Sequence, residues 1–218
     1  MNTVRSLDLQ INYWNRIGPT KTFLHPVNVE QLKRYLGPES RILDYGCGYG
    51  RALGFLHSNG YKNLSGMDPA PAMIAAARNS FPDISFEILE EFGKTALPDR
   101  SVDGVLLFAV LTCVPGDEGQ RTIIGEITRV LRTGGLLYIS DMWLQTDSRN
   151  VERYAAGEKK YGRYGVFDLP EGVTVRHHDR PWIEELTRNY KLLRVDEVDV
   201  QTMNGHSSRA FQWFGCKL

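Results

Sequence analysis

Cysteine is scarce in this chain of 218 residues, which has only Cys47, Cys113 and Cys216. The three residues are far apart and form no CxxC pair, so the sequence offers neither a disulfide framework nor a zinc site. We therefore expect a reducing compartment, the cytoplasm, and no bound metal.

The chain also lacks an excess of charge, because 26 Lys and Arg residues balance 26 Asp and Glu residues. Surfaces that bind nucleic acid usually show a basic excess, so the balance argues against such a partner without excluding a local basic patch. No segment approaches about 18 apolar residues, and the first ten residues contain no apolar stretch of the kind found in signal peptides. We expect neither membrane insertion nor secretion.

A glycine-rich stretch is the most informative feature that the chain does have. Residues 41–51 read RILDYGCGYGR, in which a short apolar run reaches Asp44 and is followed by Gly46, Gly48 and Gly50. The apolar residues after Gly50 have helical spacing, which predicts a strand, a turn and a helix in that order. Such a turn gathers backbone N–H groups and a helix N-terminus around one point, where glycine lets a ligand approach closely. A tight turn without a ligand remains the alternative.

Apolar runs and helical segments alternate after this stretch. We predict strands at 63–67, 84–89, 102–110 and 136–140, and a helix that opens at Asp117 or Glu118 and ends at Gly134-Gly135. Strands at 192–195 and 209–215, joined through 202–206, have the pattern of a hairpin, so the last strand should be antiparallel. This rhythm predicts an α/β protein with a doubly wound, mainly parallel seven-stranded sheet and helices on both faces. Ligands of such sheets bind at the carboxyl ends of the strands.

The flanking segments predict one domain over 1–218 with additions around a core at 41–141. Residues 1–40 should hold two helical pieces, one that stops at Gly18-Pro19 and one that starts at Pro26. These pieces form either a lid or helices packed on a sheet edge. Residues 142–180 are rich in Tyr, Arg and Gly with little periodicity, and we interpret them as a small inserted cap over the ligand edge. A C-terminal helix beginning near Asp179 and the hairpin complete 181–218.

Two nucleotide-binding patterns compete for the glycine turn. The nicotinamide fingerprint GxGxxG requires a glycine at position 51, where this chain has Arg51. The chain instead has Asp-x-Gly-x-Gly-x-Gly, and an acid, Asp68, at the end of the next predicted strand, where it can accept hydrogen bonds from ribose hydroxyls. Glu90-Glu91-Phe92 follows the third of the strands counted from residue 41. The run 97–103 leads into the fourth strand, and the run 129–135 precedes the fifth.

In this order the motifs resemble those of the class I S-adenosylmethionine-dependent methyltransferases, in particular the UbiE-like type 11 group. The resemblance covers residues 41–141 closely and implies a Rossmann-like fold and S-adenosylmethionine as cofactor, with S-adenosylhomocysteine as product. It implies the following cofactor-binding residues: Asp44, Gly46, Cys47 (through its backbone), Gly48, Gly50, Asp68, Pro69, Met73, Glu91, Phe92, Phe108, Ala109 and Leu111. The family often has Gly-Asp-Ala in place of Glu90-Glu91-Phe92 and a histidine near Thr112 and Cys113. The asparagine-proline-proline-aromatic motif of its nucleic-acid N-methylating relatives is absent.

Methyl transfer needs a general base only where the acceptor arrives protonated. The candidates are His177 and His178 in the cap and His206 in the last hairpin, each of which has a purely structural alternative; His25 has a weaker claim. We predict a substrate pocket formed by Tyr13, Trp14, Tyr154, Tyr164 and Asn204. Cys113 has no basic partner at a recognisable spacing, which favours a buried small residue over a nucleophile.

The favoured function is therefore methyl transfer to a small molecule by in-line displacement, in a monomer or a homodimer. Methylation of RNA or protein is one alternative. A non-catalytic module that binds S-adenosylmethionine is another, and a nicotinamide oxidoreductase is disfavoured by Arg51.

Overall fold

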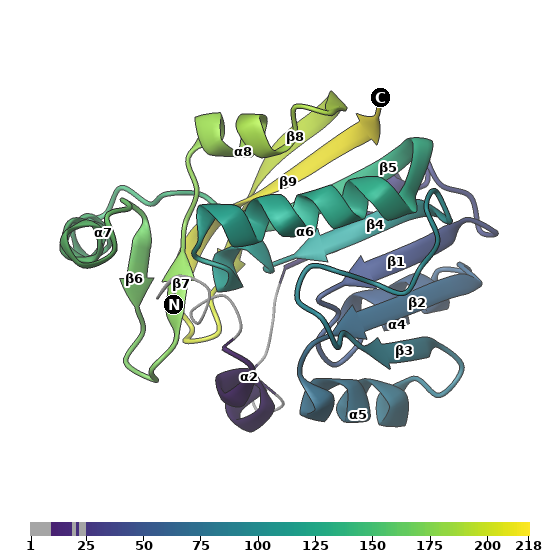
Figure 1. Ribbon diagram of the computed structural model, residues 1–218, viewed down its shortest axis with the longest axis horizontal. Helices are drawn as coiled ribbons and strands as arrows, with labels where there is room; N and C mark the ends of the chain where they lie inside the picture. The colour runs from purple at the N-terminus through teal and green to yellow at the C-terminus, as the bar shows by residue number, and fades with distance from the viewer. Residues whose placement is uncertain (1–9, 19–20, 22–24) are drawn as a thin grey trace.

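A computed structural model describes residues 10–18, 21 and 25–218 of the chain. Seven strands form one sheet in the order β3-β2-β1-β4-β5-β9-β8 (Figure 1). Their bounds are Arg41–Tyr45 for β1, Asn63–Asp68 for β2, Ser85–Ile88 for β3, Val102–Phe108 for β4, Leu131–Met142 for β5, Tyr190–Gln201 for β8 and Ser207–Lys217 for β9. Strands β1 to β5 pair in parallel, and β9 is antiparallel to both of its neighbours. The predicted mainly parallel sheet with an antiparallel last strand is confirmed.

The side on which successive strands join the sheet changes at β1. The chain passes outward from β1 through β2 to β3, and then crosses back to place β4 and β5 on the other side of β1. In open α/β sheets this reversal leaves a crevice outside the carboxyl ends of the strands on either side of it. The topology therefore places a ligand site above β1 and β4, where the glycine turn begins.

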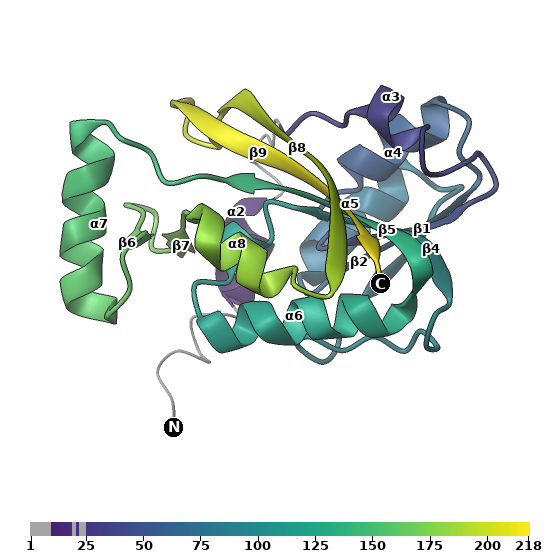
Figure 2. The same ribbon diagram turned by 90° about the horizontal axis from the view of Figure 1, so that it is seen from above.

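Helices cover both faces of the sheet (Figure 2). One face carries α3 (Val29–Leu32), α4 (Arg51–Ser58) and α5 (Pro71–Ser80), and the other carries α6 (Asp117–Val130) and α8 (Arg180–Leu186). Strand β4 serves both cores, because Val105 and Leu107 pack towards α6 while Leu106 packs towards α4. An apolar run in sequence thus becomes a strand buried on both faces, as expected for a parallel sheet.

Two of the predicted helix starts, near Asp117 and Asp179, begin helices in the structure. The Asp179 side chain accepts a hydrogen bond from the Trp182 N–H at 2.8 Å and caps α8, and two acids, Asp117 and Glu118, occupy the first turn of α6. At the other end of α6, the Lys217 ammonium donates to the carbonyls of Thr128 (2.5 Å) and Leu131 (2.7 Å). These contacts satisfy carbonyl groups that a helix leaves unpaired at its C-terminus.

Some boundaries differ from the predicted ones. Helix α3 begins at Val29 instead of Pro26, because the Asn28 side chain caps it by accepting from the Gln31 N–H. Strand β5 begins at Leu131, five residues before the predicted start at 136, because it also pairs with Val102 across an irregularity in the register. Helix α6 correspondingly ends at Val130, well before Gly134.

Residues 142–180 contain regular structure that their weak periodicity did not reveal. Helix α7 (Ser148–Tyr161) is followed by an antiparallel hairpin of β6 (Val166–Asp168) and β7 (Thr174–Arg176). The end signals of α7 were present in the sequence, since Asp147 caps its start and Gly162 ends it in the left-handed conformation. Its middle is mostly polar and buries few residues, so no apolar stripe marks it.

A separate small core joins this segment to the N-terminal helix α2 (Ile11–Ile17). Tyr13 from α2 is buried with Tyr154 of α7 and Phe167 of β6 in one apolar cluster. Helix α2 ends near the predicted stop at Gly18, whereas residues 1–9 of the predicted lid lie outside the described residues. Within the part of the chain that the structure describes, no helix is long and apolar enough to cross a membrane.

Candidate active site

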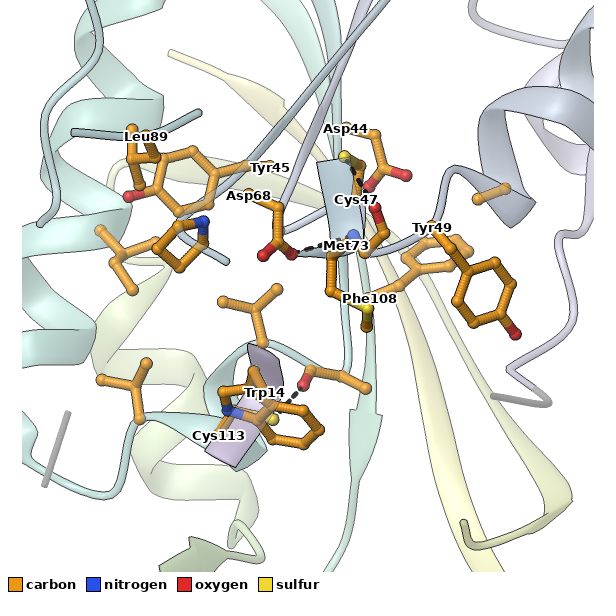
Figure 3. Close-up of a pocket in the computed structure, with 18 of the residues that line it drawn as sticks. Trp14, Asp44, Tyr45, Cys47, Tyr49, Asp68, Met73, Leu89, Phe108 and Cys113 are labelled. Carbon is orange, nitrogen blue, oxygen red and sulfur yellow. Dashed lines mark hydrogen bonds between the residues drawn. The ribbon is translucent and has the colours of Figure 1, made fainter. Parts of the chain in front are cut away.

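A pocket opens at the carboxyl ends of β1, β2 and β4 (Figure 3). Asp44 and Tyr45 contribute from β1, Asp68 from β2 and Phe108 from β4. Asp68 and Met73 point into a common space, and Trp14 and Cys113 lie on the opposite side of it (Figure 3). The pocket therefore lies at the reversal of the sheet, where the topology predicts a ligand.

The glycine turn has the conformation that its sequence predicts. Gly46, Gly48 and Gly50 have φ values of 78°, 54° and 81°, in the left-handed region that favours glycine. The N–H groups of Gly46 and Cys47 both donate to the Met67 carbonyl, at 2.7 and 2.9 Å. A Cβ on Gly46 would lie 2.4 Å from a methyl group of Val110. The turn is thus folded tightly over the end of β2 and leaves no room for a side chain at Gly46.

Asp68 joins the glycine turn to the second strand. Its two carboxylate oxygens accept from the N–H groups of Gly48 and Ala70, each at 2.9 Å. Burial raises its pKa to about 6, although the two backbone donors oppose the shift. A carboxylate has about four acceptor positions, so Asp68 keeps acceptor capacity for a ligand in the pocket.

Asp44 is the most deeply buried acid of the pocket. One of its carboxylate oxygens, Oδ1, is enclosed and has no hydrogen-bond partner among the described residues. Burial raises its pKa to about 7, Arg51 lowers it and Asp68 raises it further. Buried carboxylates are normally satisfied, so an unsatisfied one in a pocket indicates a cationic or hydrogen-bonding ligand.

Apolar side chains line the rest of the pocket. Met73, Leu89 and Phe92 line it together with Asp68, and Val110, Val114 and Ile123 also belong to its wall. Ala109 adopts a left-handed φ of 54° directly after β4, and its N–H donates to the Ser140 carbonyl at 2.8 Å. This sharp bend carries the chain away from the sheet and leaves the pocket open above β4.

The residues predicted to bind the cofactor line this pocket, except for three. Gly50 is not in the lining, but it lies against Phe86, which a Cβ on Gly50 would approach to 2.7 Å. Glu91 lies outside the pocket with an exposed side chain, which accepts from Lys94 at 3.0 Å. Leu111 is fully buried in the core on the α6 face. The structure therefore brings together the following predicted residues: Asp44, Gly46, Cys47, Gly48, Asp68, Pro69, Met73, Phe92, Phe108 and Ala109.

None of the three candidate histidines lies in the pocket lining. His177 is buried with its Nδ1 2.5 Å from the Tyr154 hydroxyl, and burial lowers its pKa to about 3. His178 is also buried, accepts from the Gln120 amide at 3.0 Å and lies 3.3 Å from the Met142 carbonyl. His206 is exposed in the turn between β8 and β9. The buried contacts of His177 and His178 favour a structural role for these two residues. His206 has no contact with the pocket lining.

The predicted substrate residues are spread along one side of the molecule. Trp14 lines the pocket, and Tyr13 packs edge-on against it at 4.9 Å between ring centroids. Tyr154 is fully buried, and Tyr164 is partly exposed and packs against it. Asn204 accepts from the Lys21 ammonium at 2.8 Å. Only Trp14 among them reaches the pocket lining.

Two pocket residues, His25 and Cys113, had at most a weak claim to a role at the site in the sequence. His25 is buried at the pocket with its Nδ1 2.9 Å from the Ser140 hydroxyl, and Arg51 donates to the His25 carbonyl at 2.5 Å. Nothing in the local sequence marks His25, because its partners lie on β5 and α4. Cys113 also lines the pocket; its thiol donates to the Ala109 carbonyl at 3.0 Å, and burial raises its pKa well above the usual value. A protonated thiol of this kind agrees with the predicted non-nucleophilic role.

Within residues 10–18, 21 and 25–218, no three His, Cys, Asp or Glu residues are grouped so that they could hold a metal ion.

The chain is similar in sequence to known proteins. Residues 43–139 match the family described as a methyltransferase domain. Trans-aconitate 2-methyltransferase of Escherichia coli O139:H28 (strain E24377A / ETEC) is 28% identical over 149 residues, which are 67% of this chain and 54% of that protein. The chain thus spans about half the length of the curated relatives that it matches.

Solved structures share the fold. A SAM-dependent methyltransferase of Methanosarcina mazei superposes with a TM-score of 0.82 at 23% identity, covering 89% of this chain and 99% of that one. A [4+2]-cyclase superposes with a TM-score of 0.66 at 14% identity, covering 98% of this chain and 94% of that one. The domain match, the curated relatives and the seven-stranded fold agree in that this chain is similar to S-adenosylmethionine-dependent methyltransferases.

Proposed function

We propose that this protein transfers the methyl group of S-adenosylmethionine to a small organic acceptor. The observation that carries the proposal is the pocket, where three features surround one glycine turn: an acid with spare acceptor capacity, a buried acid with one oxygen unsatisfied among the described residues, and an apolar wall. The same fold supports other reactions, so the proposed reaction rests on the residues of the pocket and not on the fold alone.

The residues present fit this cofactor. Asp68 offers acceptor positions for the two ribose hydroxyls, and the apolar residues Met73, Leu89 and Phe92 provide a slot for the adenine. The unsatisfied Oδ1 of Asp44 fits the ammonium group of the methionine end. The glycine turn at Gly46 and Gly48 allows the main chain to approach the ligand closely.

When bound, the cofactor supplies an activated methyl group on a positively charged sulfur. The protein's own contribution is to hold the acceptor atom in line with that group and to keep water out. Trp14 from α2 and Phe108 from β4 border the pocket and contribute to its exclusion of water. We further propose that the segments at 1–40 and 142–180 act as lid and cap of a single domain, since α2 and α7 share an apolar cluster beside the pocket.

A small acceptor is supported by two observations. The pocket is lined mainly by apolar and aromatic side chains and is bordered by α2, which suits a small organic molecule. The names of the curated relatives give trans-aconitate, a small acid, as their acceptor. Because the chain covers about half of those proteins, we propose the class of acceptor and not the compound.

Calorimetric titration and a methyl-transfer assay test the proposal. The purified protein should bind S-adenosylhomocysteine and not NAD, and it should transfer label from methyl-labelled S-adenosylmethionine to one member of a panel of small acids, alcohols and amines that includes trans-aconitate. Binding of NAD without binding of the adenosyl ligands would overturn the proposal. Binding without transfer to any member of the panel would favour the non-catalytic module or a cyclase-like reaction. Transfer to bulk tRNA or protein alone would favour a macromolecular acceptor.

A further inference from the structure

Helix α2 lies against the pocket and is hydrogen-bonded to two of its walls. On the side of α5, the Asn15 side chain accepts from the Ala72 N–H at 3.0 Å. On the side of the loop after β4, the Gln10 amide donates to the carbonyls of Cys113 at 3.3 Å and Thr174 at 2.7 Å. Gln10 Oε1 also accepts from the Thr174 N–H at 2.7 Å. The helix is therefore held in one position between α5 and this loop.

The residue of α2 that lines the pocket, Trp14, lies between these two anchors in the sequence. Figure 3 shows its ring and Cys113 on one side of the pocket, with Asp68 on the other. Tyr13 packs edge-on against the Trp14 ring at 4.9 Å between ring centroids, and Tyr13 is itself buried in the apolar cluster that it shares with α7 and β6. The indole thus forms a fixed part of the pocket wall.

The wall on the side of Trp14 is apolar and uncharged. The loop after β4 contributes Val110, Cys113 and Val114 to the lining. The Cys113 thiol donates to the Ala109 carbonyl at 3.0 Å, and burial raises its pKa well above the usual value, so the sulfur is not ionised. A ligand on this side of the pocket therefore meets an aromatic face, two valines and a neutral thiol.

Charged groups in the pocket lining are few. Among the described residues of the lining, the charged side chains are Asp44, Asp68 and Arg51. His25 is uncharged at neutral pH, because burial and the Arg51 charge lower its pKa to about 4. Arg51 donates to the His25 carbonyl, and its charge interacts with that of Asp44. With both acids ionised, the lining has a net negative charge, which the sulfonium of S-adenosylmethionine compensates. The acceptor therefore enters a site whose charges are already balanced.

The rest of the chain does not alter this balance. Of the residues outside the described part, 19–20 and 22–24 have no charged side chain, and 1–9 contain one arginine and one aspartate. Their side chains therefore add no net charge, wherever they lie.

We propose that Trp14, Val110 and Cys113 form the acceptor subsite, and that this subsite takes an uncharged molecule with a planar, apolar face. The indole offers a stacking surface for an aromatic or conjugated system. A carboxylate against this wall would lose its hydration without gaining a cationic partner, which costs free energy. The subsite therefore disfavours polyanions, and Trp14 determines the specificity. The inference rests on the proposed function, because it assumes that an adenosyl ligand occupies the side of the pocket that carries Asp68.

Calorimetric titration of the protein saturated with S-adenosylhomocysteine tests the charge preference. The probes are two matched pairs, indole with indole-3-carboxylate and 2-naphthol with 6-hydroxy-2-naphthoate, together with the polyanion trans-aconitate. We expect an uncharged probe to bind and its carboxylate partner to bind at least about tenfold more weakly. Trans-aconitate should bind more weakly than either uncharged probe. Equal or tighter binding of the carboxylates, or binding of trans-aconitate alone, would overturn the proposed preference.

Substitutions in α2 test the role of Trp14. Trp14→Ala should weaken binding of the uncharged probe about tenfold, whereas Trp14→Phe keeps an aromatic face and should weaken it by about threefold or less. Gln10→Ala removes the anchor to Cys113 and Thr174 and should cause a smaller loss than Trp14→Ala. Asn12→Ala, at an exposed position of the same helix, is the matched control and should leave the affinity unchanged. In all four variants, unchanged S-adenosylhomocysteine binding verifies that the pocket is folded.

The outcomes separate this inference from the proposed function. If S-adenosylhomocysteine does not bind the wild-type protein, the proposed function fails. If it binds, but no uncharged probe does, or Trp14→Ala binds the probe as tightly as the wild type, the acceptor subsite alone is overturned. A Trp14→Ala variant that loses S-adenosylhomocysteine binding, while Asn12→Ala retains it, would place Trp14 in the cofactor site and would also overturn the subsite.

Discussion

The N–H group of Gly48 donates to the Asp68 carboxylate across 2.9 Å, and this bond links the glycine turn to the end of the second strand. The two residues are twenty positions apart in sequence, and the parallel pairing of β1 with β2 brings their strand ends together. The acid thus shapes the turn as well as facing the pocket, so its removal has two consequences.

We expect Asp68→Ala to weaken S-adenosylmethionine binding by about 1–3 kcal/mol, since a charged hydrogen-bonding partner is lost and the Gly48 N–H is left without its acceptor. Isothermal titration calorimetry measures the effect. Glu91→Ala is the matched control, because the Glu91 carboxylate pairs with Lys94 outside the pocket and its loss should change the affinity less than threefold. Equal losses in the two variants would mean that the ribose site has been assigned to the wrong acid.

Asp44→Asn should stabilise the ligand-free protein while weakening S-adenosylmethionine binding. In the proposed function this buried carboxylate meets the ammonium group of the cofactor, and its ionised form is costly to bury without that ligand. We expect a rise in Tm of a few degrees and a fall in affinity of about tenfold, measured by differential scanning calorimetry and titration. A variant that lost both stability and affinity would show that Asp44 is a structural acid.

The stability difference between wild type and Asp44→Asn should depend on pH. The folded pKa of Asp44, about 7, lies above its ordinary value of 3.8, so the folded protein holds this proton where the unfolded chain has released it. Wild-type stability relative to the variant should therefore fall as pH rises from about 4 to about 7, and level off above. Urea unfolding at several pH values tests this, and a constant difference would contradict the raised pKa.

Two glycine-to-alanine substitutions should act in opposite directions. A Cβ on Gly157 of α7 would lie 1.7 Å from the Val166 carbonyl oxygen, so Gly157→Ala should push α7 away from β6 and cost about 1–3 kcal/mol of stability. Gly125 lies exposed in the middle of α6 with open space around it, so Gly125→Ala should add about 0.5–1 kcal/mol. Urea unfolding compares the two variants with the wild type. Similar effects at both positions would mean that the α7–β6 packing has been misjudged.

His178→Ala should reduce stability rather than act on the pocket directly. It removes a buried ring that accepts from Gln120, whose amide oxygen in turn accepts from the Trp182 indole at 2.6 Å. We expect a loss of about 2–4 kcal/mol, with unchanged affinity for S-adenosylhomocysteine in the folded variant. His206→Ala, in an exposed turn, should stay within about 0.5 kcal/mol of wild type. A folded His178 variant that bound the cofactor normally but had lost methyl transfer would return this residue to the catalytic candidates.

The sequence by itself determined the sheet and the cofactor end of the pocket. The apolar runs, the first-turn acid Asp117, the cap Asp179, and the spacing of Asp44, Gly46, Gly48 and Asp68 are short-range signals. In a parallel sheet, residues at successive strand ends meet at one edge, so local patterns were sufficient to place these groups together. Helix α7 shows the limit of such signals. Its residues are mostly polar and form no apolar stripe, so only its two caps mark it in the sequence.

Only the tertiary structure determined which histidines lie at the pocket and which lie away from it. His177 and His178 directly follow β7 and were candidate bases, but packing against Tyr154 and Gln120 buries them. His25 had the weakest claim in the sequence, yet it lies at the pocket because hydrogen bonds to Ser140, 115 positions away, and to Arg51 hold it there. A histidine's role depends on burial, on its charged neighbours and on which nitrogen is bonded. These properties arise only from contacts between distant segments, and no local pattern encodes them.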